Sequence, residues 1–269
     1  MTLIDRLRAL FPEASGRSLK QWLAHGRVDV NGRVVRDART PVAPGDRVAL
    51  RSHGEVVFPS PLRLVHEDHE ILVIDKPPGL LTIGTTRERD RTAYRLLWDY
   101  LAAQRPARRL FIVHRLDRET SGLIVFAKSV PAKRKLQEQF EARTAERGYV
   151  AVVEGLVSAD TGTLESRLTQ DKSLRVRTAR TGKQAITHYR VLGRRRDTTL
   201  LELTLSTGRR HQIRVQLAEL GHPIVGDREH GGQKNPLGRL ALHARRLRLV
   251  HPATGRPVTF ESPAPAGWV

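Results

Sequence analysis

The stretch Val113–Ser129, VHRLDRETSGLIVFAKS, limits the possible folds more than any other part of the chain. Its second half, Leu123–Ala127, is an uninterrupted apolar run, which predicts a buried β-strand. Another apolar run, Phe111–Val113, comes before it, and a turn of charged and small residues carrying Asp117 lies between them. The pattern predicts a carboxylate held between two core strands. Such a carboxylate belongs either to a functional site or to a structural ion pair.

Positive charge is the dominant feature of the composition. The 269 residues include 47 Lys and Arg against 28 Asp and Glu, which gives a formal net charge of +19. Most of the positive residues are Arg, whose planar guanidinium binds phosphate through two hydrogen bonds and stacks on bases. Genomic base composition explains Arg in place of Lys, but it does not explain the excess over acidic residues. We therefore expect a polyanionic partner, most simply nucleic acid.

The composition also excludes several classes of protein. The sequence has no cysteine, which excludes disulfides and thiolate metal sites. No apolar run approaches the ~20 residues of a membrane span, and the N-terminus lacks an apolar signal core. The run HEDHE at residues 66–70 superficially resembles a metal cluster, but it lies in an expected turn and lacks helical i, i+4 spacing. We expect a cytoplasmic monomer that needs no metal and no cofactor.

The sequence predicts two domains, a small one at residues 1–58 and a large one at residues 59–269. Two prolines in the stretch 55–63 indicate a linker between them. In the small domain, apolar residues at helical spacing predict two helices, and Val28–Val35 alternates around Asn31-Gly32, which is a strong hairpin signal. Its candidate RNA-contacting side chains are Arg17, Lys20 and Arg33. The alternative is that these charges only form a solvated surface.

A second charged cluster occupies residues 207–227, TGRRHQIRVQLAELGHPIVGD. Residues 212–220 are predicted to form a helix that ends at Gly221. Arg210, His211 and Arg214 then lie in or near its first turn, where positive charge opposes the helix dipole. This local conflict indicates a specific anionic partner, either a carboxylate or a phosphate. Asp117 is our candidate partner for Arg214.

Several motifs of the large domain closely resemble the RluA-type pseudouridine synthase family. They are VIDKPPGLL, HRLDRETSGLIVFAKS, RGYVAVVEG and GRRHQIRVQLAELGHPIVGD, together with LALHARRLRLVHPATG near the C-terminus. The likeness covers residues 62–265. In the small domain, GRSLKQWLAHGRVDVNGRVV followed by PGDRV is similar to the αL RNA-binding module named for ribosomal small-subunit protein four.

The resemblance implies an α+β fold, in which flanking helices cover a mixed, mainly antiparallel sheet. It implies an isomerase that converts uridine to pseudouridine in structured RNA, with rRNA favoured over tRNA, and without a cofactor. Asp117 would be the catalytic carboxylate, Tyr149 the ring under the target base, and Arg214 the partner of Asp117. The further residues that we expect to contact substrate are Arg115, Arg118, Lys76, His211 and Arg210.

The chain departs from the family pattern beside these residues. It has Arg210 and Gln216 in its GRRHQIRVQ run, and Arg147 where a Lys often stands. These departures concern the identity of the substrate rather than the reaction. Two other functions compete: a non-catalytic RNA-binding or ribosome-assembly protein, and a basic DNA-binding protein. Only the enzyme accounts for Asp117, Tyr149 and Arg214 together.

Overall fold

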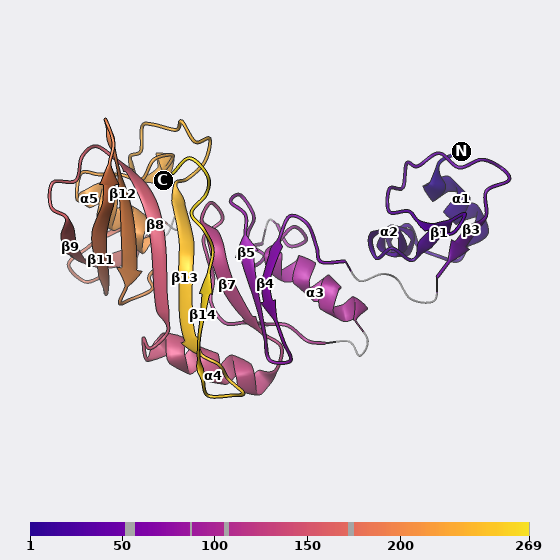
Figure 1. The fold of residues 1–269 in the computed structure, drawn as a ribbon, viewed down its shortest axis with the longest axis horizontal. Coiled ribbons are helices and arrows are strands. Elements are labelled where there is room, and N and C mark those ends of the chain that lie inside the picture. Colours follow the sequence, from indigo (N-terminus) through magenta and orange to yellow (C-terminus); the bar gives the residue numbers. More distant parts are fainter. Residues whose placement is uncertain (52–56, 87, 105–107, 172–174, 269) are drawn as a thin grey trace. The chain divides into compact units, whose positions relative to one another are not determined.

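The structure is a computed structural model that describes residues 1–269 except 52–56, 87, 105–107, 172–174 and 269 (Figure 1). It consists of two compact units, Met1–Pro59 with Leu97–Arg108, and Ser60–Leu96 with Arg109–Val269. The linker expected at 55–63 lies partly outside the described residues, and the domain boundary at residue 58 stays a prediction. Within the described residues, no helix has the length and apolar character that crossing a membrane requires.

The N-terminal unit packs two helices against a small antiparallel sheet whose strand order is β2-β1-β3. Its elements are α1 (Leu3–Leu10), α2 (Gly16–Ala24), β1 (Val28–Val30), β2 (Arg33–Val34) and β3 (Val48–Leu50). Ser15 caps α2 by accepting a 3.1 Å hydrogen bond from the Ser18 amide. Asn31 and Gly32 have φ values of 54° and 84°. A type I′ hairpin turn requires positive φ at both central residues, so the predicted hairpin is confirmed.

The second unit is built on one large twisted sheet. Its strands are β4 (Arg63–Glu67), β5 (Ile71–Lys76), β6 (Phe111–Ile112), β7 (Ser121–Ala127), β8 (Glu146–Glu154), β9 (Thr161–Gln170), β10 (Val176–Thr178), β11 (Lys183–Arg194), β12 (Thr198–Leu205), β13 (Leu242–Val250) and β14 (Pro257–Glu261). The order is β10-β9-β11-β12-β8-β13-β7-β5-β4, with β14 beside β13 and β6 beside β7. Over the described residues, only β7 and β13 pair in parallel. The sheet is therefore mixed and mainly antiparallel, as the resemblance implied.

The helices α4 (Val130–Glu141) and α5 (Gln212–Glu219) pack against this sheet, α4 against β7 and β13 and α5 against β9, β10 and β11. The 3₁₀ helix η1 (Arg228–His230) contacts α5, and α3 (Ala93–Ala103) is divided between the two units. Ser129 caps α4 by accepting the Ala132 amide, and Pro131 occupies the first turn, where a missing N–H costs nothing. Leu136 of α4 packs against Leu123 and Val125 of β7. Every residue of β7 is buried, which confirms the predicted core strand.

The β6–β7 hairpin carries Asp117 in its loop, at the end of β7 that meets β13. Phe111 pairs with Ala127, so the chain returns through a loop of residues 113–120 to the start of β7. β6 is shorter and less buried than the core strand predicted at 111–113. At Gly122, φ is 110° and a Cβ atom would lie 2.3 Å from the carbonyl oxygen of Ala244. Glycine is required here because β7 meets β13 at this contact.

Candidate active site

A cavity of about 780 Å³ opens beside the loop that carries Asp117. It is lined by that loop, by α4, by β8 and by the segment from Leu205 to Arg214. Two of its lining residues are acidic, Asp117 and Glu141. Six are arginines, namely Arg115, Arg143, Arg147, Arg209, Arg210 and Arg214. A concave, strongly positive wall with one central carboxylate suits a polyanionic substrate.

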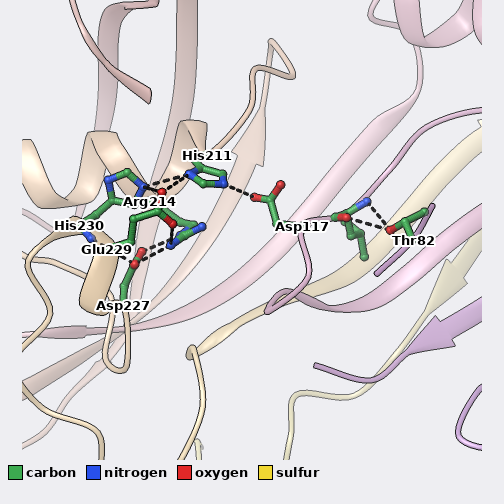
Figure 2. A network of polar contacts seen from close by, with 8 residues as sticks. Thr82, Asp117, His211, Arg214, Asp227, Glu229 and His230 are labelled. Carbon is green, nitrogen blue, oxygen red and sulfur yellow. Dashed lines mark hydrogen bonds and ion pairs between the residues drawn. The ribbon is translucent and has the colours of Figure 1, made fainter. Parts of the chain in front are cut away.

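Asp117 is held by the residues on either side of it. The buried Thr82 hydroxyl donates a 2.8 Å hydrogen bond to the Leu116 carbonyl and accepts the Leu116 amide at 3.2 Å (Figure 2). On the other side, the Arg118 carbonyl accepts the Gly79 amide at 2.9 Å. The backbone of Asp117 is therefore fixed on both sides, while its carboxylate points toward His211 in Figure 2.

Lys76 does not face the cavity, so its predicted role in substrate binding is wrong. Its side chain is completely buried. The Nζ atom donates hydrogen bonds to the carbonyls of Pro77, Leu80 and Arg118 at 2.9, 2.7 and 3.0 Å. Burial lowers the pKa of the ammonium to about 7, opposed by the negative charges of Glu119 and Asp117. Lys76 thus joins the loop after β5 to the loop that carries Asp117.

Tyr149 lies in the cavity wall. It sits in the middle of β8, paired with Leu203 of β12 and with Ala244 of β13. Because Gly122 of β7 pairs with the same Ala244, the tyrosine lies close to the end of the Asp117 loop. Tyr149 is 8% exposed. Burial raises the pKa of its phenol, and the negative charge of Asp117 raises it further. A neutral phenol therefore borders the cavity.

Arg214 also lines the cavity, but its direct partner is not Asp117. Its Nε and Nη2 atoms each donate a 2.7 Å hydrogen bond to Asp227, and Nη2 donates a third to Glu229 at 3.0 Å (Figure 2). The predicted Arg214–Asp117 ion pair is therefore wrong as a contact. Asp227, in the turn directly before η1, is thus the anionic partner that the position of Arg214 near the start of α5 predicted. Burial opposes the charge-stabilising contacts of Arg214, but the pKa of its guanidinium is raised. Asp227 raises it most, Glu229 less, and the more distant charge of Asp117 least.

His211, directly before α5, faces Asp117. Its backbone lies in the left-handed region, with φ of 52°. Its Nε2 atom lies 3.9 Å from Asp117 Oδ2, and its Nδ1 atom lies 3.0 Å from His230 Nε2. The side chain is buried, and burial lowers its pKa, opposed by the charge of Asp117.

The other predicted substrate contacts differ in their surroundings. Arg115 and Arg210 are exposed and line the cavity, so both are free to meet a phosphate. The Arg118 side chain instead forms a 2.7 Å ion pair with Glu88 and does not line the cavity. In the N-terminal unit, Arg17, Lys20 and Arg33 are all exposed.

One group in the described part of the chain has donor atoms close enough to hold a metal ion, namely His211, Glu229 and His230. The HEDHE turn is not part of it. Two features oppose a cation at this group. The ring nitrogens of His211 and His230 are hydrogen-bonded to each other, and the second carboxylate oxygen of Glu229 is bonded to Arg214. A divalent ion would therefore lie beside a buried guanidinium.

Sequence reasoning missed Thr82 and the turn formed by Asp227, Glu229 and His230. Asp227 ends the family-like segment, and its side chain is almost completely buried against Arg214. Its local signal in the sequence is its place two residues after the apolar pair Ile224-Val225. Glu229 and His230 lie in a polar stretch with no comparable signal.

A buried tyrosine and a carboxylate in a basic cavity, on a mixed sheet, are the features of an enzyme that acts on RNA. A family described as RNA pseudouridylate synthase matches residues 70–219, and the S4 domain matches residues 1–48. The chain belongs to the RluA-type pseudouridine synthase family and is an isomerase with an N-terminal S4 domain. This supports the enzyme over the non-catalytic alternative.

Individual relatives agree with this assignment. Ribosomal large subunit pseudouridine synthase D of Salmonella typhimurium is 37% identical, over 99% of this chain and 88% of the relative. The same enzyme of Escherichia coli K12 gives the same values. Among solved structures, human RNA pseudouridylate synthase domain containing 4 is similar with a TM-score of 0.63 and 26% identity, covering 77% of this chain and 90% of that one.

Proposed function

We propose that this enzyme isomerises uridines of large-subunit ribosomal RNA and that Asp117 is its catalytic carboxylate. The supporting observation is the position of Asp117, whose backbone is fixed on both sides and whose carboxylate lies in a cavity lined by six arginines. The choice of RNA rests on the relatives, which are named for the ribosomal large subunit. A cytoplasmic location and a monomeric state remain predictions.

The reaction changes the uracil atom to which the ribose is attached. The bond between C1′ of the ribose and N1 of uracil breaks, the base turns, and a bond between C1′ and C5 forms. The C5 proton is lost to solvent and N1 gains a proton, so the product is an isomer. An ionised Asp117 serves as nucleophile or as base for these steps, and its attack on sugar or on base is left open.

The basic wall stabilises a base that has left its stack. Extruding a nucleotide costs a few kcal/mol, which phosphate contacts offset. Arg115 and Arg210 are the exposed cations beside Asp117 that suit this role, and His211 lies between the carboxylate and α5. Tyr149 offers its neutral ring as an apolar surface for uracil. Arg214 acts on Asp117 indirectly, through its charge and through its contact with the turn that carries Glu229.

The N-terminal S4 domain would add a second contact with the RNA. We place this module at residues 1–58 and assign its phosphate contacts to Arg17, Lys20 and Arg33, which are exposed on α2 and β2. A second binding surface on the same chain raises the affinity for RNA that spans both.

Release of tritium from C5-labelled uridine in large-subunit rRNA tests the proposal. Asp117→Asn keeps the size of the side chain and removes the charge, so tritium release should fall to background. Glu119→Gln is the matched control, because Glu119 is an exposed carboxylate of the same loop that does not line the cavity. Activity that survives Asp117→Asn would contradict the catalytic role. Activity on transfer RNA alone would contradict the substrate.

A further inference from the structure

His230 is the residue behind His211, on the side away from Asp117. The two rings meet edge to face, with centroids 5.2 Å apart and planes at 85°. His211 Nδ1 and His230 Nε2 lie 3.0 Å apart, which is hydrogen-bond distance. Figure 2 shows the order His230, His211, Asp117. The buried ring that faces the proposed catalytic carboxylate is thus held by a second imidazole, outside the matched segment 70–219.

Only one hydrogen is shared between the two rings. Burial lowers the pKa of both histidines, and the nearby charge of Arg214 acts in the same direction, so both rings are neutral near pH 7. A neutral imidazole has one N–H and one acceptor nitrogen. If His211 Nδ1 carried the hydrogen, its Nε2 lone pair would face Asp117 Oδ2 at 3.9 Å. If His230 Nε2 donates instead, His211 presents an N–H to the carboxylate, which is electrostatically favourable.

We infer that His230 is a positioning residue, which donates from Nε2 to His211 Nδ1 and so fixes the tautomer in which His211 Nε2–H faces Asp117. The inference rests on the proposed catalytic role of Asp117. At 3.9 Å the His211–Asp117 contact is longer than a hydrogen bond in the substrate-free structure. Catalytic hydrogen bonds are often long before substrate binds and shorten in the complex.

The turn that carries His230 is built to hold it still. Asp227 caps η1 by accepting the His230 amide at 3.3 Å, while the same carboxylate binds Arg214. Gly232, which follows, donates a 2.8 Å hydrogen bond to the Asp227 carbonyl. A Cβ atom at Gly232 would lie 2.7 Å from the Ile224 carbonyl oxygen, so only glycine fits this close approach. The position of the His230 ring is therefore determined by α5 and its own turn.

Glu229 acts against this tautomer, because its carboxylate lies nearer to the unprotonated His211 Nδ1 than to the His230 Nε2–H. Its Oε1 atom lies 3.5 Å from His211 Nδ1 and 4.0 Å from His230 Nε2. The charged groups that act on the pair are Asp117 in the β6–β7 loop, Arg214 of α5, and Asp227 and Glu229 in the turn. Because Glu229 is half exposed and also bonded to Arg214, it contributes less to the orientation of His211 than the direct contact with His230.

Two variants of the full chain separate positioning from folding. His230→Phe keeps a ring but has no donor, so kcat for tritium release should fall roughly five- to tenfold, as the loss of one orienting hydrogen bond implies, with KM changed less than twofold. His230→Gln places an amide N–H near the same point and should recover most of kcat. An unchanged kcat in His230→Phe, an equal loss in both variants, or a change confined to KM would overturn the inference.

Nitrogen-15 NMR of the histidine rings gives a readout that does not depend on activity. In the wild-type protein at pH 7.5, His211 should carry its hydrogen on Nε2, and His230→Phe should shift it toward the mixed tautomers of a free imidazole. A hydrogen on Nδ1 of wild-type His211 would overturn the inference even if His230→Phe failed to fold. The proposed function fails separately, if Asp117→Asn still releases tritium.

Discussion

Arg214 donates two hydrogen bonds of 2.7 Å to Asp227, and both side chains are almost completely buried. Exposed ion pairs contribute little to stability, whereas breaking a buried pair leaves an uncompensated charge. This pair joins α5 to the turn that carries His230. Asp227, to which the sequence motifs assigned no role, therefore holds the residues nearest to Asp117 in position.

Asp227→Ala should lower the free energy of unfolding by about 3–5 kcal/mol, because the buried guanidinium of Arg214 loses its bidentate partner. Urea denaturation of the full chain, followed by circular dichroism, measures the loss. Glu229→Ala is the matched control. It removes the second, half-exposed partner of Arg214 and should cost less than about 1 kcal/mol. Equal losses in the two variants would show that the buried pair has no special weight.

Lys76→Met should both destabilise the protein and slow the reaction. The variant removes the Nζ donor from three carbonyls, of which that of Arg118 keeps the Gly79 amide, and this should lower the free energy of unfolding by about 2–3 kcal/mol. Because one of these carbonyls belongs to Arg118, directly after Asp117, kcat should fall more than KM rises. Arg118→Gln is the control, since it removes an exposed ion pair but keeps that carbonyl. A kcat for Lys76→Met equal to that of Arg118→Gln would contradict this positioning role.

The sequence predicted the elements well because their signals are local. The apolar run of β7, the Asn31-Gly32 turn and the end of the 212–220 helix at Gly221 each depend on neighbouring residues, and the structure confirms these elements. Partner choice is not local. Asp117 was the carboxylate predicted for Arg214, and the path of the chain after α5 brings Asp227 to it instead.

The contacts of Lys76 likewise could not be predicted from its neighbours in the sequence. A lysine in a Pro- and Gly-rich loop usually stays in solvent, and nothing near it in the sequence indicates three carbonyls converging on one point. The carbonyl of Arg118 comes from a distant loop. A buried cation of this kind becomes visible only when two loops are seen together.

His114 should make the stability of the protein sensitive to acid. Its Nε2 atom accepts the Val125 amide at 3.2 Å, and its ring stacks on Phe140. Burial, with a contribution from the charge of Arg147, lowers its pKa to about 3 from an ordinary value of 6.5. Between these values the unfolded chain binds more protons, so stability rises with pH. The contribution of His114 is complete above pH 6.5 and is lost as the pH falls toward 3.

His114→Gln tests this dependence, because its amide oxygen accepts the same N–H and does not titrate. Between pH 6.5 and pH 4.5 the wild type should lose about 1–2 kcal/mol more unfolding free energy than the variant. Urea denaturation at the two pH values gives both slopes. The same loss in wild type and variant would place the acid sensitivity elsewhere.

The salt dependence of RNA binding tests the S4 domain. If Arg17, Lys20 and Arg33 each neutralise one phosphate, changing all three to Gln should reduce the slope of log K against log salt by roughly 2–3. Arg8→Gln with Arg39→Gln is the matched control, since these exposed arginines of the same unit are already paired with Asp5 and Asp37. Filter binding to large-subunit rRNA fragments from 50 to 300 mM salt measures the slopes. A triple variant with the slope of the control would assign the phosphate contacts to the arginines of the catalytic cavity instead.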